Sequence, residues 1–151
     1  MASWRKRIER GGGSDLRPHE RLLGGIFLNP DGHTGSLMAK EVAGVVGAAV
    51  AARRRDHEIP PSGLAAVLPD SECWLGLTGS RLLVWRHSVL RGRPGGLITH
   101  LPASDLVGVD LTRRRATHAV DLRFADGSAR RYEAPRLMND PVAFASAVND
   151  R

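Results

Sequence analysis

The side chains that could carry out catalysis or bind a metal ion are scattered along the chain. The six histidines stand singly, without the HxxxH or HExxH spacing that places two imidazoles on one metal ion; they are His19, His33, His57, His87, His100 and His118. No serine lies in a GxSxG turn, and the aspartates at 105, 110, 121 and 126 are better explained by structural roles. We therefore expect no enzyme, no metal and no cofactor.

The basic residues form the strongest candidate binding features, because the formal net charge is +6. Clusters of arginine attract anionic lipids, nucleic acids or acidic proteins, although a solvated, compositional role is the simpler explanation. Arg91-Gly-Arg-Pro-Gly-Gly lacks the lysine and threonine of a phosphate-binding loop, so a hairpin connection with two exposed arginines is expected. The candidate anion-binding or partner-binding residues are Arg53, Arg54, Arg55, Arg91, Arg93, Arg113, Arg114 and Arg115.

The kind of partner follows from what accompanies these charges. Nucleic acid is disfavoured, because aromatic side chains are not interleaved with the arginines and Trp74 and Trp85 lie in strands that look buried. A membrane-binding surface needs an apolar wedge beside the charge, and Val42–Ala52 followed by Arg53–Arg55 comes nearest. That stretch has no Trp, Phe or Leu, so packing on the core is the better interpretation.

The compartment is expected to be the cytoplasm. Cys73 is the only cysteine, which excludes an intramolecular disulfide, and its apolar neighbours predict a buried, inert thiol. The basic start is not followed by the apolar core of a signal peptide, since Gly11–Gly13 intervenes. The longest apolar run, Val42–Ala52, would reach about 17 Å as a helix, against about 30 Å of hydrocarbon.

The pattern of apolar residues predicts one mainly antiparallel β domain. Residues 1–14 are expected to be a flexible basic tail, followed by a single domain over 15–151 with a helical insertion at about 36–55. Gly24-Gly25 within the first strand indicates a bulge or a close backbone approach, and Asp140-Pro141 predicts the start of a closing helix. Strands are expected near residues 21–28, 64–68, 72–77, 81–86, 97–101, 106–112, 119–124 and 128–133.

The clearest local prediction is a hairpin from Trp74 to Trp85, in which two apolar runs flank the polar turn Thr78–Arg81. A second hairpin is indicated by the alternation of Val120, Leu122 and Phe124 with polar residues before the Ala125–Gly127 turn.

These segments, in this order, resemble bacterial pleckstrin-homology-like (PH-like) domains of actinobacterial type. Leu75–Trp85 is similar to the strand-turn-strand signature of that family, Leu101–Val109 to its "IPLSDIxxV" segment, and Phe124–Ser128 to its "F.DG" turn. The resemblance covers about 64–148 and implies an α+β, mainly β fold: a barrel or sandwich of about seven strands with a C-terminal capping helix. The Ala/Val-rich helix after the first strand would be an addition to that fold.

The leading hypothesis is a non-catalytic PH-like binding or scaffold module that engages a protein partner in the cytoplasm. The alternative is a peripheral protein that binds anionic lipid at the inner membrane face through its Arg-rich loops, with Arg53–Arg55 as the main contact. A small enzyme of unknown type is the third hypothesis.

Overall fold

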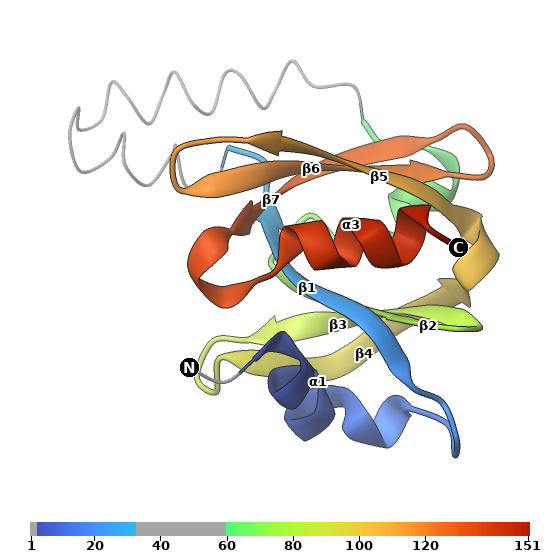
Figure 1. Cartoon of the computed structure of the whole chain (residues 1–151), viewed down its shortest axis with the longest axis vertical. Helices are drawn as coiled ribbons and strands as arrows, with labels where there is room; N and C mark the ends of the chain where they lie inside the picture. The colour runs from blue at the N-terminus through green and yellow to red at the C-terminus, as the bar shows by residue number, and fades with distance from the viewer. Residues whose placement is uncertain (1–2, 33–59) are drawn as a thin grey trace.

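The computed structural model describes residues 3–32 and 60–151, and their main feature is one seven-stranded antiparallel sheet (Figure 1). The strands are β1 (Leu22–Pro30), β2 (Cys73–Thr78), β3 (Arg81–Ser88), β4 (Arg93–Pro102), β5 (Leu106–Arg113), β6 (Thr117–Phe124) and β7 (Ala129–Pro135), in the spatial order β4-β3-β2-β1-β7-β6-β5. Two α-helices, α1 (Trp4–Gly12) and α3 (Pro141–Asn149), pack on this sheet.

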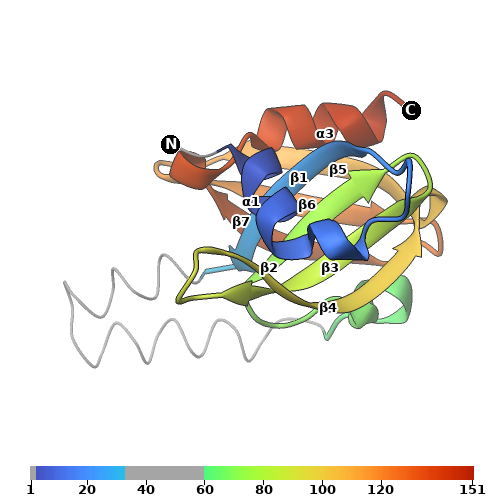
Figure 2. The ribbon, with the colours of Figure 1, turned by 90° about the horizontal axis from the view of Figure 1, so that it is seen from below.

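Strand β1 belongs to both halves of the sheet. Along most of its length it pairs with β2, from Leu22 opposite Thr78 to Leu28 opposite Cys73. At its end it pairs instead with β7, where Asn29 lies opposite Glu133. The sheet therefore folds into two layers, β1–β4 and β5–β7, with β1 running from one to the other (Figures 1 and 2).

The main hydrophobic core lies between these layers, and α3 closes one side of it (Figure 1). The helix begins as expected, because the Asp140 carboxylate accepts a hydrogen bond from the Ala143 N–H at 3.0 Å and Pro141 occupies the first turn. Phe144 and Val148 then enter the core from one face of the helix, since i and i+4 positions point the same way. The prediction of a seven-stranded sandwich capped by a C-terminal helix is confirmed.

Most of the expected strands are confirmed, including the hairpin that pairs Trp74 with Trp85 across β2 and β3. The strand expected over 64–68 is wrong, because Gly63–Val67 forms a 3₁₀-helix in which only Ala65 is buried. This segment offers no alternation of buried and exposed residues to a strand neighbour. Three further 3₁₀-helices lie at Gly13–Asp15, Ala103–Asp105 and Arg136–Met138. The helical insertion expected at about 36–55 lies outside the described residues.

The flexible tail expected over 1–14 is also wrong for residues 3–14, most of which form α1. Ser3 caps the helix, and Ile8 is fully buried against the outer face of the β1–β4 layer. The contact requires Gly25 in β1, because a Cβ there would lie 2.4 Å from the Trp4 ring and 2.5 Å from Ile8. The close approach expected at Gly24-Gly25 is thus made by the supposed tail.

Helix α1 also explains why β2 is buried at every position. One face of the strand lines the main core, and the other lies in a second cluster beneath α1. That second cluster contains Ile8, Leu22, Phe27, Trp74, Leu83 and Trp85. Continuous burial of this kind is the reason that the strand reads as an unbroken apolar run.

Candidate functional site

The candidate arginines within the described residues lie on two strand connections. Arg91 lies in the β3–β4 connection, Arg93 is the first residue of β4, and Arg113–Arg115 lie at the β5–β6 connection. Both connections lie toward the left of Figure 1, but on different layers of the sandwich. Arg91 is exposed as expected, whereas Arg93 begins β4 and is half-buried. Arg53–Arg55 lie outside the described residues.

Arg114 is held by two ion pairs within the described part of the chain. Its guanidinium donates to Asp31 at 2.8 Å and lies 3.6 Å from the Glu133 carboxylate. The ion pairs tie the β5–β6 connection to the end of β1. Arg113 and Arg115 are exposed, so of these three residues they are the ones presented to solvent.

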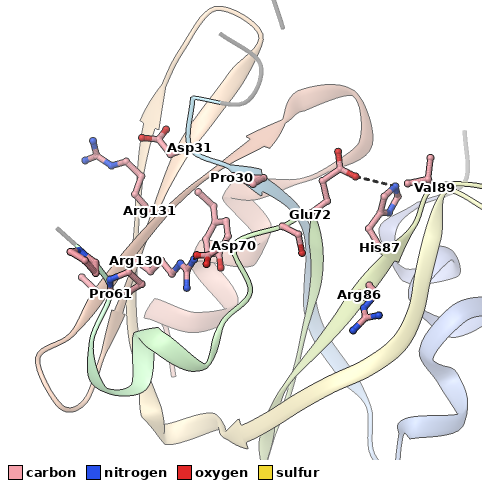
Figure 3. A pocket seen from close by; sticks show the side chains of 14 residues that line it. Pro30, Asp31, Pro61, Asp70, Glu72, Arg86, His87, Val89, Arg130 and Arg131 are labelled. Carbon is pink, nitrogen blue, oxygen red and sulfur yellow. Dashed lines mark hydrogen bonds and ion pairs between the residues drawn. The ribbon is translucent and has the colours of Figure 1, made fainter. Parts of the chain in front are cut away.

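A groove opens where β1 passes from β2 to β7, and its volume is about 1040 Å³. We call it the groove; its walls come from the end of β1, the segment before β2, the end of β3 and the start of β7 (Figure 3). It is lined by Pro30, Asp31, Pro60, Pro61, Asp70, Ser71, Glu72, Arg86, His87, Val89, Ala129, Arg130, Arg131 and Tyr132.

His87 is an ionisable group of the groove that is held on both ring nitrogens. Its Nδ1 accepts a hydrogen bond from the Trp74 indole N–H at 3.0 Å, so the neutral ring carries its proton on Nε2. That Nε2 lies 3.8 Å from the Glu72 carboxylate (Figure 3). Burial lowers the pKa of His87, and the charge of Arg7 lowers it further, while Glu72 acts in the opposite direction. The groove therefore presents a neutral imidazole held in one tautomer.

The opposite wall is pinned by hydrogen bonds. Arg130 donates to the Leu68 carbonyl at 2.5 Å, binds the Asp70 carboxylate and covers the Tyr132 ring. The Tyr132 hydroxyl donates to the Pro69 carbonyl at 2.6 Å, and burial raises its pKa. These contacts fix the segment that leads into β2 against β7, so the groove is preformed on this side.

Sequence reasoning missed the tip of the β3–β4 connection. The Val89 and Leu90 side chains are 79% and 99% exposed, and Arg91 follows them directly. Helix α1 reaches the same tip, because the Arg7 guanidinium donates to the Gly92 carbonyl at 2.7 Å. The sequence signal for this tip is the apolar pair Val89-Leu90, which directly precedes the segment Arg91–Gly96 that predicts a hairpin connection.

Within residues 3–32 and 60–151, no group of three or more His, Cys, Asp or Glu side chains is arranged to hold a metal ion. Cys73 is fully buried, and desolvation raises its pKa to about 12, so the thiolate is strongly disfavoured. Neither helix of this part of the chain has the length and apolarity needed to cross a bilayer. No family model matches the chain, and no curated protein matches it either.

Proposed function

We propose that this chain is a non-catalytic binding module of the PH-like type, which receives a polypeptide segment of a protein partner in the groove. The observation that carries the proposal is the groove itself, a preformed hollow beside the strand that joins the two layers. Its position on a rigid sandwich suits recognition, because strands and pinned connections hold the lining side chains in place. The PH-like assignment rests on the resemblance of the motifs and on the order of strands and closing helix.

The lining favours a polypeptide ligand. Pro30, Pro61 and Val89 provide apolar surface, while His87 and Arg86 provide hydrogen-bond donors. Such a mixture of apolar surface and a few placed polar groups matches the alternating side chains and amide groups of an extended peptide. The volume of about 1040 Å³ lies at the upper end of the range for small-molecule pockets, which also favours a longer ligand.

The charges of the groove argue against a polyanionic ligand. Three carboxylates, those of Asp31, Asp70 and Glu72, line it together with its arginines. A phosphate-rich ligand would approach these carboxylates at an electrostatic cost, whereas a peptide can match both signs. We therefore assign the groove to a protein partner rather than to a lipid headgroup or a nucleic acid.

A peptide-display selection against the folded protein tests this proposal. Ala129 lines the groove and is exposed at the start of β7, so Ala129→Trp should fill the groove without entering the core. Peptides selected on the unmodified protein are expected to bind Ala129→Trp at least about tenfold more weakly, as measured by isothermal titration calorimetry. Ala143→Trp, at an exposed position of α3, is the matched control and should bind as the unmodified protein does.

Two results would overturn the assignment. One is the absence of any enriched peptide from a library that yields binders for a control domain. The other is enrichment of peptides whose affinity is the same for Ala129→Trp as for Ala143→Trp, because the binding surface would then lie elsewhere.

A further inference from the structure

The tip of the β3–β4 connection carries two aliphatic side chains that contribute nothing to either core cluster. Val89 is 79% exposed and Leu90 is 99% exposed, whereas the strand that leads to them is buried from Arg81 to Trp85. The turn holds them outward, since the Gly92 N–H donates to the Ser88 carbonyl at 2.8 Å. Exposed aliphatic groups at a hydrogen-bonded tip form a small, fixed apolar wedge.

Cations are concentrated in the two elements that meet at this wedge, the β3–β4 connection and α1. The segment 86–93 contains three arginines and no carboxylate of its own, and α1 adds four cations with only the carboxylate of Glu9. The Glu72 carboxylate lies 3.8 Å from the His87 imidazole and offsets one of these charges. Together the cations are Arg5, Lys6, Arg7, Arg10, Arg86, Arg91 and Arg93. Much of the formal net charge of +6 is therefore concentrated in these two elements. A surface of this kind attracts a dense array of negative charge.

The two elements are held as one unit. The Arg7 side chain donates to the Gly92 carbonyl at 2.7 Å, so the first turns of α1 lie beside the tip (Figures 1 and 2). Gly11 packs against the carbonyl of Pro94, where an added Cβ would lie only 2.3 Å from the oxygen. Ile8 anchors the helix in the second cluster. The exposed basic side chains of α1 are thus positioned by the same contacts that support the wedge.

We propose that this surface, which we call the wedge surface, docks on an anionic lipid bilayer, with Val89 and Leu90 entering the interface and the cations contacting lipid headgroups. Apolar insertion and electrostatic attraction are the two interactions that hold peripheral proteins on membranes, and here they occur side by side. The wedge surface adjoins the groove, and Arg86 and Val89 border both.

A nucleic acid would use the cations but not the wedge. Binding to single strands relies on aromatic side chains that stack on bases, whereas the exposed side chains at the tip are aliphatic. Trp4, the aromatic residue of α1, is partly buried and packs against the second cluster. The bilayer therefore accounts for both features of the surface.

Vesicle flotation tests the proposal with the full chain. We expect binding to vesicles of phosphatidylcholine with about 30% phosphatidylglycerol, weakening with added salt, and little binding to pure phosphatidylcholine. Val89→Ser with Leu90→Ser should lower the partition coefficient about tenfold. The matched control is Val107→Ser with Val142→Ser, which removes two half-exposed valines from β5 and α3 and should leave partitioning unchanged.

The charge contribution has its own matched pair. Arg91→Gln and Arg93→Gln should each lower partitioning on the anionic vesicles by about fivefold. Arg17→Gln and Arg21→Gln change exposed arginines near the start of β1, away from the wedge surface, and should have a much smaller effect. Ala129→Trp, which fills the groove, should leave vesicle binding intact, so failure of one proposal is distinguishable from failure of the other.

Insertion is measured directly with a polarity-sensitive fluorophore on Leu90→Cys. Labelling is selective because the native Cys73 is buried. We expect a blue shift on anionic vesicles at position 90 and none for the same label on Val142→Cys. Absence of binding, binding that survives Val89→Ser with Leu90→Ser, or binding to single-stranded RNA without binding to vesicles would each overturn the proposal.

Discussion

The side-chain amide of Asn139 hydrogen-bonds both backbone groups of Phe27. The Phe27 N–H donates to Asn139 Oδ1 at 2.6 Å, and Asn139 Nδ2 donates to the Phe27 carbonyl at 3.0 Å. The same Nδ2 donates to the Pro135 carbonyl at 2.9 Å. The amide thus stands in for a strand neighbour on the side of β1 that faces away from β2, at the point where β1 leaves one layer for the other.

Replacement of this amide should therefore destabilise the fold. Asn139→Asp keeps the size of the side chain but places a carboxylate against two carbonyls, so we expect the free energy of unfolding to fall by about 2–3 kcal/mol. Asn149→Asp is the control, because Asn149 makes the same two-bond contact with Val109 at an exposed position where water can substitute. Urea denaturation measures both variants; equal losses would contradict the special role of Asn139.

The helical N-terminal segment makes a second prediction. Ile8→Ala should lower the free energy of unfolding by about 2–4 kcal/mol, because Ile8 is fully buried against Phe27 and Trp85 in the second cluster. Gly25→Ala should cost about 1–3 kcal/mol, since the added methyl group collides with Trp4 and Ile8. Glu9→Ala, on the exposed face of α1, should change little. A mobile segment would give no loss in any of the three.

Acid sensitivity should depend on Glu20. Hydrogen bonds from Arg81 are the main cause that lowers the pKa of Glu20 from 4.5 to about 2. Because the pKa is depressed in the folded state, the stabilisation is present above pH 4.5 and is lost as the pH falls from 4.5 through about 2. Glu20→Gln should lower stability at neutral pH by about 2 kcal/mol and flatten the acid limb. An unchanged acid limb, followed by circular dichroism against pH, would exclude this origin.

His87 should titrate below its ordinary value, in the Nε2–H tautomer, and two charge changes should move its pKa in opposite directions. Glu72→Gln should lower the pKa further, because the Glu72 carboxylate favours the protonated ring. Arg7→Gln should raise it by removing a positive charge. The stability contributed by neutral His87 is present above pH 6.5 and declines below it. Nitrogen-15 spectra of the imidazole report both the tautomer and the pKa, and shifts of the same sign would refute this account.

The strands were predictable where one local pattern determined them. Alternation from Val120 to Phe124 and the unbroken apolar runs around Trp74 and Trp85 carry the β signal in a few residues each. Helix α1 was not predictable in this way, because its stability comes from packing on Gly25 and β4, which are distant in the sequence. The sequence indicates flexibility at Gly11 and Gly12. In the structure Pro94 lies against Gly11 and Trp85 lies against Gly12, so neither position has room for a side chain.

The candidate site likewise has features that the sequence shows and features that only the tertiary structure shows. Arginine clusters are visible in the sequence itself, whereas the groove is assembled from segments that lie far apart in the sequence and that no spacing rule connects. The Val89-Leu90 pair looks in the sequence like a continuation of β3, and only the turn after Ser88 places it in solvent. Exposure of an apolar side chain depends on the tertiary structure, so the sequence alone points to Val42–Ala52 as the nearest apolar wedge and not to Val89-Leu90.

The sharing of β1 between two layers also sets the order in which the protein can fold. β1 is made early, yet its neighbours include β7 and the amide of Asn139, a contact between residues 112 positions apart. During synthesis the strand therefore remains incompletely paired until β7 and Asn139 have also left the ribosome. Closing so long a loop is entropically costly and slow. A nascent chain at this stage can already cover the Phe27 side chain in the second cluster, but the Phe27 N–H and carbonyl still lack their Asn139 partner.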